Sequence, residues 1–136
     1  MIRGSCLCGA VAYEAGELSG PMGHCHCRTC QKAHSAAFAT TARTMRDGFR
    51  WTRGGELVTA FESTPGKNRW FCPRCGSHLM AEWKASDAVI LRIGCVDEGL
   101  TTLPRAHIWV SHAAPWDLGR DELPRYEEGA PPPPPG

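Results

Sequence analysis

The sequence lacks an excess of charge of either sign and lacks any long apolar run. Its 15 Lys and Arg residues nearly balance 14 Asp and Glu residues, giving a net charge of +1, and the basic residues are spread along the chain. This balance argues against binding to nucleic acid or to a membrane surface through bulk charge. No stretch approaches the roughly 20 apolar residues of a membrane-spanning helix. What remains is an ordinary globular composition, and a length of 136 residues indicates one domain.

Nothing in the first residues resembles a secretory signal, because Met1 to Ser5 lead directly into cysteines without an apolar segment. We therefore expect a cytoplasmic protein. In a reducing compartment, the eight cysteines of the chain are expected to be metal ligands or catalytic groups rather than disulfides.

Helical periodicity is scarce, and only Arg28 to Ala33 looks helical, for one or two turns. Short runs of strand character dominate instead, which predicts an all-β fold of small sheets with long loops. The runs at 49–53 and 57–62 flank Gly54-Gly55, which predicts that they pair as a hairpin. The other predicted strands are residues 11–14, 37–41, 69–71, 79–83, 89–93 and 106–110.

The C-terminal segment "EEGAPPPPPG" is a Pro/Gly run that cannot build a core. We expect it to be a disordered tail at residues 127–136. The zinc-binding domain discussed next would then occupy residues 1–126.

Two of the cysteine groups can complete one tetrahedral metal site. Cys72 and Cys75 form a CxxC in which Pro73 presets a turn and Gly76 tolerates positive φ. Cys6 and Cys8 form a CxC, whose side chains reach the same face of an extended segment. The two pairs together make a closed Cys₄ zinc site. A redox-active CxxC is the alternative, but it leaves the CxC without a role.

The third group, "CHCRTC", offers three thiolates at Cys25, Cys27 and Cys30. Three protein ligands with an open fourth position are typical of a catalytic zinc. The alternative is a closed, structural Cys₃His site. His34 is the best placed to close it, because His24 and His26 are adjacent to ligands on an extended stretch and should point away. Cys95 stands alone and is expected to behave as a small buried hydrophobe.

Several motifs, in this order, resemble the glutathione-dependent formaldehyde-activating (GFA) family, which also includes centromere protein V. They cover residues 4 to about 126 and read "GSCLCGAVAYE", "CHCRTCQK", "STPGKNRWFCPRCGSHL", "IGCVDE", "HIWVSHAAPW" and "LPRY". The chain departs from the family pattern at Cys95, where Thr or Ser is more frequent, and at Ser35, where Gly is frequent.

The resemblance implies a Mss4-like β-tent fold with two zinc ions per chain, divided as above. It also implies the condensation of formaldehyde with glutathione to S-hydroxymethylglutathione, a carbon–sulfur lyase activity. The chemistry of the ligands agrees, because a zinc bound by three thiolates is a weak Lewis acid that suits the binding of an incoming thiol. His34, His26, Arg28 and Lys32 are candidates to donate a proton or to bind a substrate carboxylate.

A non-catalytic zinc module that binds a protein or peptide is the alternative function. The chain has five tryptophans that could form a docking surface, although Trp70 and Trp109 are expected in strands and in the core.

Overall fold

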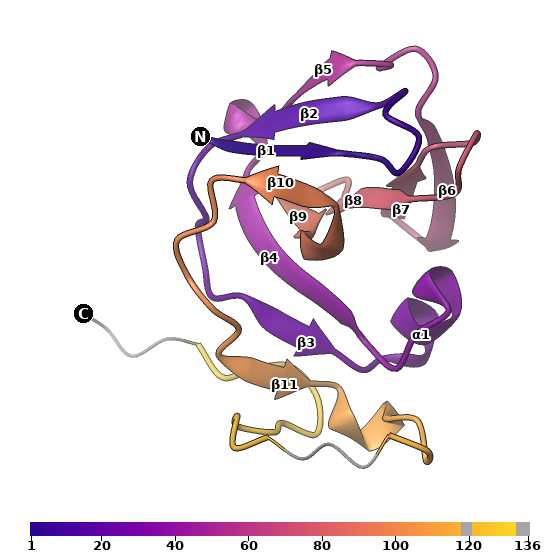
Figure 1. The fold of residues 1–136 in the computed structure, drawn as a ribbon. Coiled ribbons are helices and arrows are strands. Elements are labelled where there is room, and N and C mark those ends of the chain that lie inside the picture. The colour runs from indigo at the N-terminus through magenta and orange to yellow at the C-terminus, as the bar shows by residue number, and fades with distance from the viewer. Residues whose placement is uncertain (118–120, 133–136) are drawn as a thin grey trace.

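The computed structural model describes residues 1–117 and 121–132, and its regular elements are mostly β-strands, arranged in two sheets (Figure 1). The first sheet has four strands in the order β10-β1-β2-β5, and the second has seven in the order β11-β3-β4-β9-β8-β7-β6. The strands are β1 (Ile2–Ser5), β2 (Ala12–Ala15), β3 (Gly23–Cys25), β4 (Ala39–Met45), β5 (Arg50–Arg53), β6 (Thr59–Thr64), β7 (Lys67–Phe71), β8 (His78–Trp83), β9 (Ala88–Arg92), β10 (Val96–Glu98) and β11 (Ala106–Ile108). The all-β prediction is confirmed.

The four-stranded sheet is antiparallel and is held by a close contact at its centre. Gly4 in β1 is opposite Tyr13 in β2. A Cβ atom at Gly4 would collide with the Tyr13 ring and with the carbonyl of Cys95, so glycine is required there. Tyr13 stacks on Phe49, is 1% exposed and is the largest fully buried side chain among the described residues.

The seven-stranded sheet is antiparallel except at one edge, where β11 pairs in parallel with β3. In this pairing Ile108 lies opposite Cys25. The parallel pair brings the C-terminal part of the chain against the strand that leads into "CHCRTC" (Figure 1).

The hairpin predicted around Gly54-Gly55 is wrong. β5 pairs with β2 in the first sheet, whereas β6 pairs with β7 in the second. Gly54, at φ +71°, begins a tight turn in which its carbonyl accepts hydrogen bonds from the amides of Leu57 and Val58. The glycines therefore redirect the chain from one sheet to the other, which a local turn signal cannot distinguish from a hairpin.

One α-helix is present among the described residues, α1 (Arg28–His34), close to the predicted range. It ends at Ser35, whose φ of 50° is left-handed and normally favours glycine. The described part of the chain also contains three short 3₁₀ turns, η1 (Arg46–Gly48), η2 (Ile93–Cys95) and η3 (Val110–His112). None of the described helices has the length and apolarity needed to cross a bilayer.

The predicted tail at residues 127–136 is described only as far as residue 132. Its first two residues contact the domain, because the carbonyls of Glu127 and Glu128 accept hydrogen bonds from the amides of Ser111 and Trp109. The proposed disorder of residues 133–136 lies outside the described residues. Trp109 is not in a strand as expected, since it follows β11 with a left-handed φ of 57°.

Candidate metal centres and the cavities beside them

The four cysteines of the predicted closed site lie together. Cys6 and Cys8 follow β1, Cys72 and Cys75 lie in the turn between β7 and β8, and all four Sγ atoms are within 4.8 Å of one another. The Cys6–Cys8 and Cys8–Cys72 sulfur distances are 3.6 and 3.8 Å. A tetrahedral zinc with bonds of about 2.3 Å requires sulfurs about 3.8 Å apart. The four residues therefore fit a zinc ion.

The two turns that carry these cysteines are fixed by backbone hydrogen bonds. The Gly76 amide donates to the Cys72 carbonyl, and Gly76 has φ +78°, as the turn prediction required. The Leu7 amide donates to Ser77 Oγ at 3.0 Å and joins one turn to the other. Hydrogen bonding between Cys75 and Ser77 lowers the pKa of Cys75 to about 5, which favours the thiolate that a metal requires.

The second cluster is built on one continuous segment. Cys25 ends β3, Cys27 caps the N-terminus of α1, and Cys30 lies within its first turn. Cys27 Sγ accepts a hydrogen bond from the Cys30 amide at 3.3 Å. The three Sγ atoms lie within 4.8 Å of one another, and the structure adds no fourth Cys, His, Asp or Glu from the described residues to this group. The three residues fit a metal with an open position.

The three histidines weighed as a fourth ligand all lie elsewhere. His26 is 0% exposed and its Nε2 is 2.7 Å from His107 Nδ1, so it points away from the cysteines as predicted. His24 Nδ1 is 2.9 Å from Thr40 Oγ1. His34, the favoured candidate, instead packs its ring 4.8 Å from that of His78.

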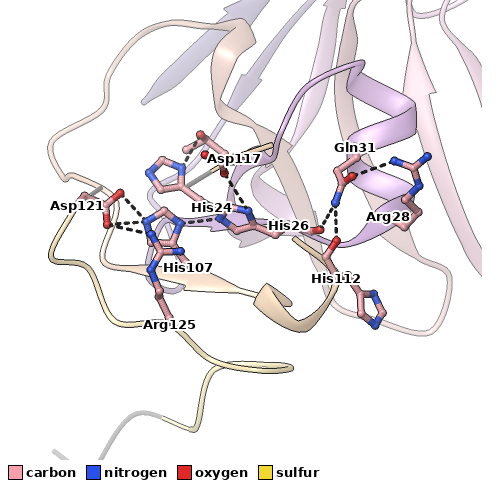
Figure 2. Close-up of polar contacts among 10 residues, drawn as sticks. His24, His26, Arg28, Gln31, His107, His112, Asp117, Asp121 and Arg125 are labelled. Carbon is pink, nitrogen blue, oxygen red and sulfur yellow. Dashed lines mark hydrogen bonds and ion pairs between the residues drawn. The ribbon is translucent and has the colours of Figure 1, made fainter. Parts of the chain in front are cut away.

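A hydrogen-bonded clamp, which the sequence did not reveal, fixes the segment that carries the second cluster (Figure 2). Gln31 Nε2 donates to the carbonyls of His26 and His112, both at 2.7 Å. His107 from β11 contacts His26 on one side and Asp121 on the other, the latter at 2.7 Å. The C-terminal segment thus holds the cysteine loop in place. The "HIWVSH" motif was the only sequence signal for it.

Two buried arginines lie beside the second cluster, and sequence analysis missed both. Arg69 in β7 is 2% exposed, and its Nη1 is 3.8 Å from Cys30 Sγ. Arg92 ends β9 and is 4% exposed. Hydrogen bonds from the thiols of Cys25 and Cys27, followed by the charges of Arg92 and Arg69, hold the pKa of Cys30 well below its usual range. A basic residue within an apolar strand was the available signal.

Two cavities flank the pair of rings formed by His34 and His78. The first, which we call the Arg92 cavity, has a volume of about 460 Å³, and its lining includes both histidines together with Thr40, Ser77, Arg92 and Cys95. The second, which we call the Arg69 cavity, has a volume of about 670 Å³. It is lined by residues that include Arg28, Lys32, Phe61, Arg69, Phe71 and His78. Both volumes are typical of small-molecule sites.

Cys95 is half-buried and packs against the main core, as expected of a small hydrophobe, but it also borders the Arg92 cavity. Burial raises the pKa of its thiol. It is therefore protonated at neutral pH and is not part of either metal group.

Taken together, the two sheets and the two cysteine clusters define an all-β, Mss4-like protein with sites that fit zinc. The sequence profile of the family described as glutathione-dependent formaldehyde-activating enzyme matches residues 1–112, and the chain belongs to this family. The chain is also similar to a crystal structure of a Rhodobacter sphaeroides protein, with 25% sequence identity and a TM-score of 0.62. That similarity covers 91% of this chain and 99% of the other. No curated protein matches the chain.

Proposed function

We propose that the protein is a zinc-dependent carbon–sulfur lyase that acts on a small thiol adduct, in the manner of an S-hydroxymethylglutathione synthase. The observation that carries the proposal is the cluster of Cys25, Cys27 and Cys30, which no fourth ligand from the described residues completes. It lies next to buried cations, and cavities of small-molecule size adjoin these cations. Membership of the GFA family supports the same activity.

A zinc ion bound by these three cysteines would supply a position at which an incoming thiol is held as its thiolate. In the cleavage direction the carbon–sulfur bond of RS–CH₂–OH breaks and its electron pair leaves with sulfur. The hydroxyl proton is lost as the carbon–oxygen bond becomes the carbonyl of formaldehyde. Synthesis is the reverse, and neither direction needs an oxidant or a reductant.

The residues around the cluster have distinct roles in this proposal. Arg69 lies against Cys30, so its charge stabilises negative charge on sulfur. Arg28 and Lys32 are on the exposed side of α1 and border the Arg69 cavity, where they suit the carboxylates of a thiol such as glutathione. Phe61 and Phe71 give the same cavity an apolar wall.

The protein needs reduced cysteines for these roles, which supports the cytoplasmic location expected from the sequence. The remaining four cysteines would bind the second, structural zinc. We propose two zinc ions per chain on this basis.

A zinc module that docks a partner protein is the alternative, and one observation favours it. Trp116 is 69% exposed and Trp83 is 40% exposed, which is unusual for large aromatic side chains. In contrast, Trp70 and Trp109 are half-buried against the cores.

Cobalt spectroscopy tests the proposed function. The metal is replaced by Co²⁺ and a neutral thiol, 2-mercaptoethanol, is added before glutathione is tried. We expect the visible spectrum to change on thiol addition and to change in the same way in His34→Ala. Cys27→Ser is the control that should abolish the response.

A spectrum that stays constant with every thiol in the native chain, but responds once His34 is replaced by alanine, would mean a closed Cys₃His site. The enzyme proposal would then give way to the binding module.

A further inference from the structure

Arg92 has hydrogen-bond donors that no acceptor among the described residues satisfies. Its side chain is 4% exposed, and its Nε and Nη2 atoms are enclosed without a hydrogen-bond partner among the described residues. Buried guanidinium donors in folded proteins are almost always paired, because leaving them unpaired is costly. Arg92 also lines a cavity large enough for a small ligand, so a ligand bound there would lie beside its guanidinium group.

Two histidines that line the same cavity also have an enclosed ring nitrogen. His34 Nε2 and His78 Nδ1 are both buried without a partner among the described residues. Burial, followed by the charge of Arg92, lowers the pKa of His34 to about 4 and also lowers that of His78. Both rings are therefore neutral at pH 7, and a neutral imidazole can turn an N–H toward an acceptor.

The charges around the Arg92 cavity favour the binding of an anion as the hydrogen-bond acceptor. The described residues that line it include no aspartate or glutamate. Arg69 lies near enough to Arg92 to oppose its charge, and the compensating negative charge comes from Cys30 and its neighbours in the cluster. Three thiolates and a bound Zn²⁺ would carry one net negative charge against the two buried guanidinium groups, which leaves the Arg92 cavity attractive to a small oxyanion.

We propose that the Arg92 cavity binds a carboxylate of the substrate, with Arg92 as the residue that determines this specificity. The inference rests on the proposed function. It narrows the substrate to a thiol adduct with a carboxylate close to the carbon–sulfur bond, rather than the uncharged hydroxymethyl group alone. For an adduct RS–CH(OH)–COO⁻, the carbon–sulfur bond breaks, its electron pair leaves with sulfur, and the hydroxyl loses a proton to give the 2-oxo acid.

Binding of acetate to the zinc-loaded full-length chain tests the cavity without any variant. Acetamide has the same shape but no charge and serves as the matched probe. We expect acetate, and glyoxylate more strongly, to raise the melting temperature and to bind in isothermal titration, whereas acetamide does neither. Equal binding of acetate and acetamide, or no binding of either carboxylate, would overturn the proposal.

The variant Arg92→Gln locates the bound anion. Loss of a charge-assisted pair should weaken acetate binding by about 10- to 100-fold. Arg43→Gln is the control, since Arg43 is an exposed arginine on the adjacent strand β4. If Arg92→Gln is folded by circular dichroism and binds acetate as well as the native chain does, the anion lies on the metal or elsewhere and the proposal is wrong.

Cleavage assays identify which part of the substrate carries the carboxylate. Adducts of 2-mercaptoethanol with glyoxylate and with formaldehyde are compared, followed by the formaldehyde adduct of 3-mercaptopropionate. We expect Arg92→Gln to lower kcat/KM for the glyoxylate adduct by about 10-fold or more and to leave the 2-mercaptoethanol–formaldehyde adduct nearly unchanged. A selective loss with the mercaptopropionate adduct instead would assign the carboxylate to the thiol. Equal loss with all three adducts would contradict a role in specificity.

The proposed lyase function and the proposed carboxylate site at Arg92 can be refuted independently. The cobalt response to 2-mercaptoethanol involves no carboxylate, and acetate binding involves no thiol. Acetate binding that depends on Arg92, in a protein whose cobalt spectrum ignores thiols, would remove the lyase function and leave the anion site. A thiol response without acetate binding would do the reverse.

Discussion

The two cysteine clusters use the same ligand chemistry in opposite structural settings. Cys6 and Cys72 are members of the main hydrophobic core, and their cluster joins the turn after β1 to the turn before β8. Cys25, Cys27 and Cys30 come from one short segment and pack in a separate small cluster with Ala39. The first set connects the two sheets, whereas the second follows a single strand, β3, of one sheet.

The residues that surround the two cysteine clusters also differ. The first cluster is carried by two turns that are fixed by backbone hydrogen bonds and joined to each other through Ser77. The second lies against Arg69, and its loop is joined to the C-terminal segment by the contacts of Gln31 with His112 and of His26 with His107. A metal site can thus be closed for folding or left open for chemistry according to how many ligands the chain supplies and what surrounds them.

The largest expected effect is the difference in fold stability between a variant of the first cluster and a variant of the second. Structural zinc binding is worth on the order of 10–16 kcal/mol, against a total domain stability of about 5–15 kcal/mol. We expect Cys72→Ser to abolish cooperative unfolding and soluble yield. Cys27→Ser should shift the melting temperature by only a few degrees, about the effect of changing a helix cap. Equal destabilisation in thermal unfolding would refute the division between the clusters.

Chelation should distinguish the same two sites by kinetics. The native chain is expected to hold two zinc ions and to lose them in two phases, because the second cluster offers one ligand fewer. Metal analysis during mild chelation measures this, with Cys27→Ser expected to show the slow phase alone. A well-folded preparation that contains no metal would contradict both sites.

Arg69 should affect only the second cluster. Removing its charge in Arg69→Met raises the pKa of the neighbouring thiol, so cobalt loading at the three-cysteine site should need a pH higher by about one unit. Arg43→Met, on an exposed arginine, should leave the loading curve in place. An unshifted curve for Arg69→Met would show that the Arg69–Cys30 contact does not stabilise the thiolate.

The smallest expected effect is a pH dependence at His34. Its pKa is lowered to about 4 in the folded chain, below the ordinary value near 6.5, so the unfolded chain binds the proton more readily. The stability contributed by neutral His34 is complete above about pH 6.5 and is lost as the pH falls toward 4.

Urea unfolding at pH 7.5 and 5.5 measures this loss. His34→Gln should lose less stability than the native chain between the two values, by about 1 kcal/mol or less after allowance for partial exposure. The opposite sign would mean that His34 is charged in the folded protein.

The sequence was most informative where chemistry depends on spacing. The CxC, CxCxxC and CxxC groups predicted which cysteines meet, and Gly76 predicted its turn, because these features are local. The strand after Gly54 was assigned to the wrong partner, since pairing depends on contacts far along the chain. Arg69 and Arg92 were missed for the same reason: a basic residue in a strand gives no local sign that it faces a cysteine cluster from another strand.

The most direct test of the account is a crystal structure of the zinc-loaded protein soaked with 2-mercaptoethanol. We predict one zinc bound by Cys6, Cys8, Cys72 and Cys75, and a second bound by Cys25, Cys27, Cys30 and the sulfur of the added thiol. A second zinc whose fourth ligand is a protein side chain, with the thiol absent from it, would contradict the central claim that one site is closed and the other open.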